Sequence, residues 1–320
     1  MIAALAAAVL AAVPLQRVGA QESGRSRGPR ETHLQVGAAS LYVRAVGQGP
    51  AVIVLHGGPD FDHGYLLPDL DRLADRFHLI YYDQRGRGES AANVRPEEVT
   101  LASDMDDLDR VRRHFHLQAP IILGHSWGAV LAMEYAVRHP THVSRLILMN
   151  PAPASAADYA IMRQAYLAAL GADMDRQRAM IAGAAYQHGD PEAVAARYRI
   201  HFIHAFGNAA DYETMMARMR AGFIRQGREG ILEARTVEAQ LMRDTWQADG
   251  YDLTPRLRDL RVPTLVITGD HDFIPAEVAA HIAHSLPTGE LVTLAGCGHF
   301  AFLECAPQVH AALDSFMRQR

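Results

Sequence analysis

The sequence predicts an α/β protein with a mostly parallel central sheet, flanking helices and a helical segment inserted late in the sheet. From residue 34 onward, short runs rich in Val, Ile and Leu alternate with longer segments of helical periodicity. This alternation is typical of strands joined by crossover helices. The strand runs are apolar at nearly every position, so we expect both faces of the sheet to be covered.

Each predicted strand is a short apolar run. An opening hairpin is expected at residues 34–46, LQVGAASLYVRAV. Six further strands are expected in the runs AVIVLHG, HLIYYD, PIILG, SRLILMN, TLVITG and ELVTLAG. Between the fourth and fifth of these runs the sequence is rich in Ala, Met, Arg and Gln and contains no comparable strand. We therefore predict a core domain at residues 34–150 and 250–320, with a helical cap at residues 151–249.

Size and charge favour a globular protein with small partners. The chain has 320 residues, 49% of them hydrophobic, which is enough to bury a large core. Its 31 basic and 36 acidic residues give a formal net charge of -5. The densest acidic stretch, DMDDLDR at residues 104–110, is predicted to be a solvent-exposed helix face. This balance gives no basic surface for nucleic acid or an anionic membrane, so we expect a small-molecule or short-peptide substrate.

The first 20 residues, MIAALAAAVLAAVPLQRVGA, form an apolar run that ends in small residues. The pattern predicts an export signal cleaved between Ala20 and Gln21, although its first basic residue follows the apolar run instead of preceding it. The run is shorter than the ~20 residues that a spanning helix needs, so no stable membrane anchor is expected. Residues 21–33 are predicted to be a flexible lead-in. A functional signal implies a periplasmic or secreted protein, and otherwise a cytoplasmic one.

A serine lies between two glycines in the stretch GHSWG, where an apolar run gives way to a helical pattern. Gly124, Ser126 and Gly128 match the G-x-S-x-G turn that exposes a nucleophilic serine at the end of a strand. Glycines on either side avoid the Cβ clashes that would block so sharp a bend. The N-terminus of the following helix favours developing negative charge at this point. We therefore predict that Ser126 is a nucleophile.

A serine nucleophile needs a base to take its proton and an acid to orient that base. Asp272 and His299 follow two later strand runs, and the order Ser, Asp, His is typical of this kind of turn. Asp270 is a second candidate for the acid, but it directly follows Gly269 at the end of its strand. Asp272 lies further into the loop, so we predict that it is the partner of the histidine.

The oxyanion formed during acyl transfer needs backbone N–H donors. We predict that Trp127, the residue after the nucleophile, supplies one of them. Gly58, in the stretch HGGPD, is predicted to supply the other, because glycine lets the backbone approach the substrate closely. Gly57 and His125 lie beside these donors and are predicted to contact the substrate.

Cysteine and histidine positions indicate neither a disulfide framework nor a metal site. The chain has two cysteines, Cys297 and Cys305, which we expect to be unpaired thiols, with one bridge as the alternative. Two histidine pairs with helical i,i+3 spacing occur at residues 201–204 and 281–284. Neither has a third ligand at a diagnostic spacing, so no metal and no other cofactor is expected.

The stretches HGGPD, YYDQRGRGES, GHSWGA, GDHD and GCGH together resemble the α/β-hydrolase superfamily and, within it, the proline iminopeptidase-like branch. The resemblance covers residues 34–150 and 255–320. It implies the α/β-hydrolase fold and a role for DQRGRGES in supporting the active-site loops. The sequence departs from the branch at Asp60 and His125, where glycines are usual. Its cap also lacks the Trp-Glu pair typical of enzymes that hold the free N-terminus of a peptide.

We predict a serine hydrolase that cleaves an ester or amide bond of a small substrate through an acyl-enzyme intermediate. The first alternative is an aminopeptidase of the proline iminopeptidase type, with Glu233, Glu238 and Asp244 as candidate acceptors of the substrate ammonium. The second is a non-catalytic small-molecule binding protein on the same fold. Haloalkane dehalogenase and epoxide hydrolase chemistry is disfavoured, because those enzymes carry an aspartate at the position of Ser126. A cap rich in Met and aromatic residues favours an apolar acyl group.

Overall fold

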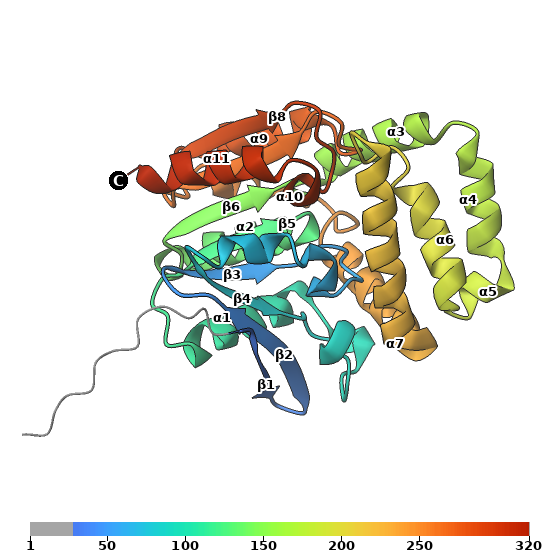
Figure 1. The fold of residues 1–320 in the computed structure, drawn as a ribbon, viewed down its shortest axis with the longest axis horizontal. Helices are drawn as coiled ribbons and strands as arrows, with labels where there is room; N and C mark the ends of the chain where they lie inside the picture. The colour runs from blue at the N-terminus through green and yellow to red at the C-terminus, as the bar shows by residue number, and fades with distance from the viewer. Residues whose placement is uncertain (1–27, 320) are drawn as a thin grey trace, which may run out of the picture.

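The computed structural model describes residues 28–319 and contains a single eight-stranded sheet within them (Figure 1). The strand order is β1-β2-β4-β3-β5-β6-β7-β8. The first two pairings in this order are antiparallel and the other five are parallel, as predicted. The strands are β1 (Arg30–Val36), β2 (Ala39–Val46), β3 (Ala51–Leu55), β4 (His78–Tyr82), β5 (Ile121–His125), β6 (Arg145–Met149), β7 (Thr264–Gly269) and β8 (Gly289–Leu294).

The start of the fold differs from the sequence prediction. Strand β1 begins at Arg30, so the last four residues of the predicted lead-in, 30–33, pair with β2 instead of forming a flexible segment. The predicted export signal, its cleavage site and residues 21–27 lie outside the described residues. No helix within residues 28–319 is long and apolar enough to cross a membrane.

The central sheet is covered on both faces, which explains why its strands are apolar at nearly every position. In β3, Ile53 and Leu55 pack into one core cluster, and Val52 and Val54 pack into the other. This alternation follows from the two-residue period of a strand. One face is covered by α1 (Leu101–His114), α2 (Trp127–Arg138), α8 (Thr254–Leu257) and α9 (Ala276–Ser285). The other is covered by α10 (Ala301–Glu304), α11 (Ala306–Arg318) and the 3-10 turns η1 (His63–Leu66) and η2 (Leu70–Leu73).

The helices between β6 and β7 form a cap beyond the carboxyl ends of the parallel strands (Figure 1). Gly227, with φ 68° and ψ 178°, interrupts the longest of them and divides it into two helical parts. The cap helices are α3 (Ala156–Leu170), α4 (Asp173–Ala182), α5 (Ala184–Gln187), α6 (Pro191–His201) and α7 (Ala209–Asp244). The cavity described below lies between the cap and the sheet.

The acidic stretch in α1 is not a solvent-exposed face, and that prediction is wrong. Arg87, from the loop after β4, pairs with Asp104 at 2.6 Å, and both side chains are fully buried. Arg85, from the same loop, pairs with the buried carboxylate of Asp107 at 2.5 Å. A buried carboxylate is stable only when it is paired, and these two arginines supply the partners. The loop after β4 is therefore fixed to α1.

Candidate active site

Ser126 occupies a sharp turn between β5 and α2. Its backbone angles are φ 55° and ψ -119°, a conformation that residues other than glycine rarely adopt. A Cβ atom on Gly124 would lie 2.3 Å from the carbonyl oxygen of Gly128, and one on Gly128 would lie 2.3 Å from the carbonyl oxygen of Leu55. Both contacts are too close for any side chain. The spacing of the two glycines is thus a steric requirement of the turn.

The turn places Ser126 at the N-terminus of α2. Its side chain makes no capping hydrogen bond to the helix, and the residue lines a cavity under the cap. Trp127 is the first residue of the helix, so its N–H has no partner within the helix. The hydroxyl is therefore available for chemistry beside an unpaired backbone donor.

His299 and Asp272 are brought together at the same edge of the sheet. Nδ1 of His299 lies 2.9 Å from each carboxylate oxygen of Asp272, and both side chains are almost fully buried. A carboxylate accepts hydrogen bonds, so the neutral imidazole carries its proton on Nδ1 and leaves Nε2 as an acceptor. His299 also lines the cavity that contains Ser126. This is the tautomer that a general base for the serine needs.

The two candidate aspartates have different surroundings. Oδ1 of Asp270 lies 2.7 Å from Nδ1 of His271 and accepts the N–H of Gly296 at 2.7 Å, and its side chain is 43% exposed. Asp272, which we preferred, faces His299 with a fully buried carboxylate. Asp270 instead stabilises the exposed part of the loop.

Asn150, which the sequence analysis missed, completes the environment of Asp272. Its Nδ2 donates to Asp272 Oδ2 at 2.8 Å and to the carbonyl oxygen of Gly298 at 3.0 Å. The N–H of Ile274 donates to Asp272 Oδ1 at 2.9 Å. Asn150 has a φ of 46°, a conformation that Asn tolerates better than most residues. It directly follows β6 and is the last residue of the predicted run SRLILMN, and this position at the end of a strand would have identified it.

The loop that carries His299 is fixed at several points. Cys297 and Cys305 form a disulfide around it, so our expectation of two unpaired thiols is wrong. Their Cα atoms are 6.1 Å apart, within the range that a bridge can span. Inside this loop, the carboxylate of Glu304 accepts the N–H groups of Gly298 and Phe300, the two neighbours of His299. Sequence spacing alone gives neither contact.

His125 lines the cavity, so its predicted contact with substrate stays a prediction, but both of its ring nitrogens have partners within the protein. Its ring is 1% exposed, and Nε2 lies 2.9 Å from the carbonyl oxygen of His299. Because a carbonyl only accepts, Nε2 carries the proton and Nδ1 accepts from the hydroxyl of Tyr65 at 2.7 Å. Burial lowers the pKa of His125 well below its ordinary value. The neutral ring therefore positions the backbone of His299 instead of contacting substrate through a polar atom.

The two glycines of the HGGPD loop have different surroundings. Gly57 donates its N–H to the hydroxyl of Tyr65 at 2.8 Å, so this N–H is used within the protein, and the predicted substrate contact of Gly57 stays a prediction. Gly58 lines the cavity with a φ of 123°, and a Cβ on it would lie 2.3 Å from the N atom of Asp60. Only glycine fits there, which leaves Gly58 as the candidate oxyanion donor of this loop.

The loop after β4 supports HGGPD, as the resemblance implies. Gln84 donates its backbone N–H to Nε2 of His56 at 3.0 Å and its side-chain amide to the carbonyl oxygen of His56 at 2.9 Å. Arg87 in turn donates to the side-chain oxygen of Gln84 at 2.7 Å. These contacts connect the HGGPD loop to the buried ion pair with α1.

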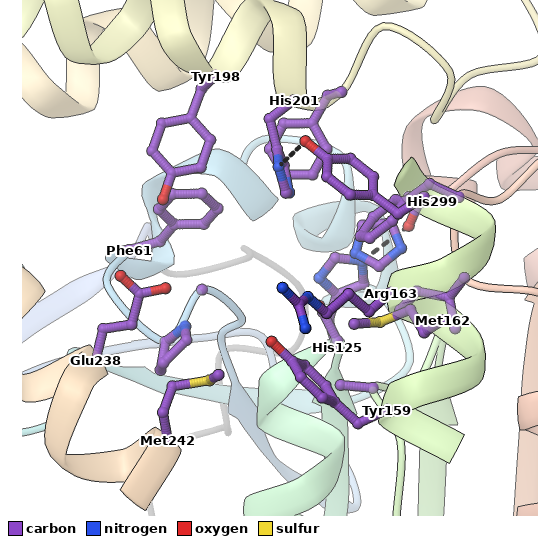
Figure 2. A pocket seen from close by; sticks show the side chains of 18 of the residues that line it. Phe61, His125, Tyr159, Met162, Arg163, Tyr198, His201, Glu238, Met242 and His299 are labelled. Atoms are coloured by element: carbon purple, nitrogen blue, oxygen red, sulfur yellow. Dashed lines mark hydrogen bonds between the residues drawn. The ribbon is translucent and has the colours of Figure 1, made fainter. Parts of the chain in front are cut away.

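A cavity of about 280 Å³ lies between these loops and the cap (Figure 2). Ser126, His299 and Gly58 line its sheet side. Its other walls are mostly aromatic and apolar, with three charged side chains among them. The cap and loop residues that line it include Phe61, Tyr159, Met162, Arg163, Tyr166, Arg197, Tyr198, His201, Phe202, Glu238, Met242, Trp246 and Phe273.

Comparison with known proteins agrees with this architecture. Residues 50–306 match the α/β hydrolase fold family. The chain belongs to this family. A proline iminopeptidase from Lactobacillus helveticus (strain DPC 4571) is 29% identical over 287 residues, covering 87% of this chain and 94% of that protein.

Two solved structures show how this α/β hydrolase relates to others. The proline iminopeptidase of Mycobacterium smegmatis is 25% identical with a TM-score of 0.65, covering 91% of this chain and 98% of that one. Est816, described as an N-acyl homoserine lactone degrading enzyme, is 21% identical with a TM-score of 0.64, covering 89% of this chain and 100% of that one. The second similarity is one of fold. The relatives place this α/β hydrolase in the proline iminopeptidase-like branch.

Of the three acids considered for an ammonium site, this α/β hydrolase places only Glu238 on the cavity within its described residues. Asp244 instead accepts the N–H of Leu101 at the start of α1, at 2.8 Å. Trp246 also lines the cavity, so a Trp and a Glu both face it although the sequence showed no recognisable pair. Burial, reinforced by the negative charge of Asp60, raises the pKa of Glu238 to about 8.

Asp60, at the usual glycine position, is a buried acid behind the cavity. Its Oδ2 accepts the hydroxyl of Tyr198 at 2.6 Å, and burial raises its pKa. The positive charges of Arg197 and Arg235 act on both Asp60 and Glu238. These four residues form a charge cluster, two acids and two bases, which we call the cap cluster.

The histidine pairs have other partners in this α/β hydrolase. Nδ1 of His201 lies 2.8 Å from the hydroxyl of Tyr166, and Nδ1 of His281 lies 2.8 Å from a carboxylate oxygen of Asp158. No group of three or more His, Cys, Asp or Glu residues within residues 28–319 is arranged to hold a metal ion.

Proposed function

We propose that this α/β hydrolase is a serine hydrolase that cleaves an ester or amide bond of a small substrate through an acyl-enzyme. The observation that carries the proposal is the contact of the Asp272 carboxylate with Nδ1 of His299, at the cavity that exposes Ser126. This contact leaves Nε2 of His299 free to accept a proton from the serine. A binding protein would have no need for an oriented imidazole at that position.

The mechanism follows from the proton positions. Nε2 of His299 takes the hydroxyl proton as Oγ of Ser126 bonds to the substrate carbonyl carbon, giving a tetrahedral oxyanion. The N–H groups of Gly58 and Trp127 stabilise that oxyanion. His299 then returns the proton to the leaving group, the bond to it breaks, and an acyl-enzyme remains. Water repeats the sequence and releases the acid product.

Pre-steady-state kinetics with a p-nitrophenyl ester tests this proposal. We expect a burst of p-nitrophenol equal to the enzyme concentration when deacylation is slow, and steady turnover after it. Ser126→Ala should lose both by several orders of magnitude. Ser285→Ala, which changes a serine on α9 outside the site, is the matched control. A Ser126→Ala variant with near-normal turnover, or a wild-type protein without any, contradicts the proposal.

The position of Glu238 favours a second candidate, an aminopeptidase that holds a substrate ammonium in the cavity. This candidate is supported by the similarity of the chain to two proteins named proline iminopeptidase. An ammonium entering this cavity needs a carboxylate partner, because burial of an unpaired charge costs several kcal/mol. Glu238 is the cavity carboxylate available for that pairing.

Two esters with one leaving group, differing only in a free or an acetylated α-amine, distinguish the candidates. The apolar walls lead us to expect that the acetylated and other uncharged esters are the better substrates. A preference of about 100-fold for the free amine, about 2.7 kcal/mol of transition-state binding, would instead establish the aminopeptidase. In that event Glu238→Gln should abolish the preference.

We also infer export to an oxidising compartment. The bridge between Cys297 and Cys305 supports this inference, because disulfides are rare in the reducing cytosol. Mass spectrometry of the native protein should find Gln21 as the first residue. An intact Met1 on a cytoplasmic product would refute the inference.

A further inference from the structure

One wall of the cavity is formed by a single face of α3. Tyr159, Met162, Arg163 and Tyr166 line the cavity from this helix, at the spacing that places side chains on one helical face. Arg163 is the charged member of this set. Figure 2 shows its guanidinium extending into the cavity, toward the opposite wall that carries Glu238.

Arg163 differs from most of the other arginines of the cap, and Arg243, which also has no carboxylate partner among the described residues, does not line the cavity. Several of these pair with carboxylates: Arg176, Arg178, Arg199, Arg218, Arg220, Arg225 and Arg228. Arg197 and Arg235 lie over the rings of Tyr198 and Tyr186, at 4.4 Å and 3.7 Å. Within residues 28–319, Arg163 has no carboxylate within 4 Å and lies over no aromatic ring. Its charge is therefore not matched by the protein.

The acid across the cavity does not supply the missing charge. Glu238 lies beyond ion-pair distance of Arg163, and the positive charges of Arg197 and Arg235 already act on it. With a pKa of about 8, its carboxyl is largely protonated at neutral pH. Asp60 shares the same two arginines. Because Glu238 is largely protonated, the cap cluster offers no free carboxylate to Arg163, whose positive charge adds to that of Arg197 and Arg235.

We propose that the substrate of this hydrolase carries a carboxylate, which binds to Arg163 beside an apolar body held by the aromatic walls. The proposal rests on the serine hydrolase function above. A guanidinium presents a planar fork of N–H donors that matches a carboxylate in a bidentate pair. Arg163 is exposed at the cavity, so its guanidinium is accessible to a substrate carboxylate. Anionic esters should therefore be selected over neutral ones of equal size.

Two matched pairs of esters test the proposal. In the acyl pair, mono-p-nitrophenyl glutarate is compared with its methyl ester. In the leaving-group pair, 4-acetoxybenzoate is compared with methyl 4-acetoxybenzoate. Each rate is divided by that of uncatalysed hydrolysis. We expect kcat/KM to favour the anionic member by about tenfold or more in one of the two pairs, according to the side of the scissile bond on which the carboxylate lies.

Variants then assign the preference to Arg163. Arg163→Gln should reduce the preference by about tenfold while kcat/KM for the neutral esters stays within about twofold, and Arg163→Lys should retain part of it. Arg178→Gln, which removes an exposed cap arginine that does not line the cavity, is the matched control and should change neither value. If Arg163→Gln loses the preference and Arg178→Gln keeps it, the preference comes from a contact with Arg163 and not from the total positive charge of the cap.

Two results would overturn the proposal: wild-type protein that hydrolyses neutral esters as well as anionic ones in both pairs, or a preference that persists in Arg163→Gln. Neither result affects the serine hydrolase function, which fails only if turnover is absent or survives Ser126→Ala. Melting temperatures of all variants show whether a lost preference reflects a lost fold. Because Arg163 is exposed at the cavity, we expect them to match the wild-type value.

Discussion

Buried carboxylates on the two sides of the cavity differ in how completely their oxygens are hydrogen-bonded. On the sheet side, both oxygens of Asp272 accept hydrogen bonds, from His299, Asn150 and Ile274. On the cap side, Asp60 uses one oxygen to accept from Tyr198, and its Oδ1 is buried with no hydrogen-bond partner among the described residues. Nε of Arg197, in the same cluster, is also buried without one.

We infer from this difference that the sheet side of the cavity carries out the chemistry and that the cap side recognises the substrate. A general base works best when its tautomer and orientation are fixed before the substrate arrives, and the contacts of Asp272 and His299 achieve this. Recognition works through groups that gain a partner when the substrate binds, and Arg163, which has no carboxylate partner among the described residues, is of that kind. Changes on the sheet side should therefore lower the rate for every substrate, whereas changes on the cap side should alter selectivity.

The largest expected effect is on the sheet side. Asp272→Asn keeps the size of the side chain but removes the charge that holds the proton on Nδ1 of His299, so kcat should fall by about 10³–10⁴-fold. Asp270→Asn is the matched control, since its amide oxygen can still accept from Gly296, and it should stay within about threefold of wild type. Steady-state kinetics with one neutral ester measures both. An equal loss of kcat in the two variants would show that His299 does not depend on Asp272 more than on Asp270.

An intermediate effect is expected from the bridge around His299. Replacing Cys297 and Cys305 by alanine should lower the free energy of unfolding by about 2–3 kcal/mol and reduce kcat for all substrates, because the loop that holds the base is released. Chemical denaturation and steady-state kinetics measure the two effects. Reductant should affect wild type in the same direction and leave the double variant unchanged. A reduced wild-type protein with full kcat would show that Glu304 and His125 suffice to position His299.

A third effect, on stability and not on rate, concerns its pH dependence on the cap side. The pKa of Glu238 is raised from 4.5 to about 8, so the folded state holds a proton that the unfolded state releases above pH 4.5. Its contribution to stability is therefore present at low pH and is lost as the pH rises through 8. Glu238→Gln removes this dependence. The melting temperature of the variant minus that of wild type should increase between pH 5 and pH 9, and a constant difference would contradict the shift.

The sequence could predict the residues on the sheet side of the cavity, because they lie at the ends of strands. Ser126, Asp272 and His299 each follow a short apolar run, and the carboxyl ends of parallel strands meet at one edge of a sheet. Position after a strand was therefore enough to bring them together in the prediction. Asn150 carries the same signal and was missed because no role was sought for an amide.

Residues outside the strand ends depend on contacts that sequence spacing does not contain. Tyr65 reaches Gly57 and His125 from a 3-10 turn, and nothing local marks its hydroxyl as part of the site. The cap acids Glu233, Glu238 and Asp244 could not be ranked. All three lie in the helical part of α7 that follows Gly227, and the sequence does not show which face of that part meets the cavity. Pairing of the cysteines likewise depends on the directions of their Cβ atoms, which their spacing of eight residues does not fix.

The most direct test of this division is the rate at which an organophosphonate labels the protein, with the adduct located by peptide mass spectrometry. The reagent reports on activation of the nucleophile and carries no carboxylate for the cap to recognise. We predict a single adduct on Ser126, formed at rates within about twofold in wild type and Arg163→Gln and at least about 100-fold more slowly in Asp272→Asn. An adduct at another residue, or an equal loss of rate in the two variants, would contradict the account.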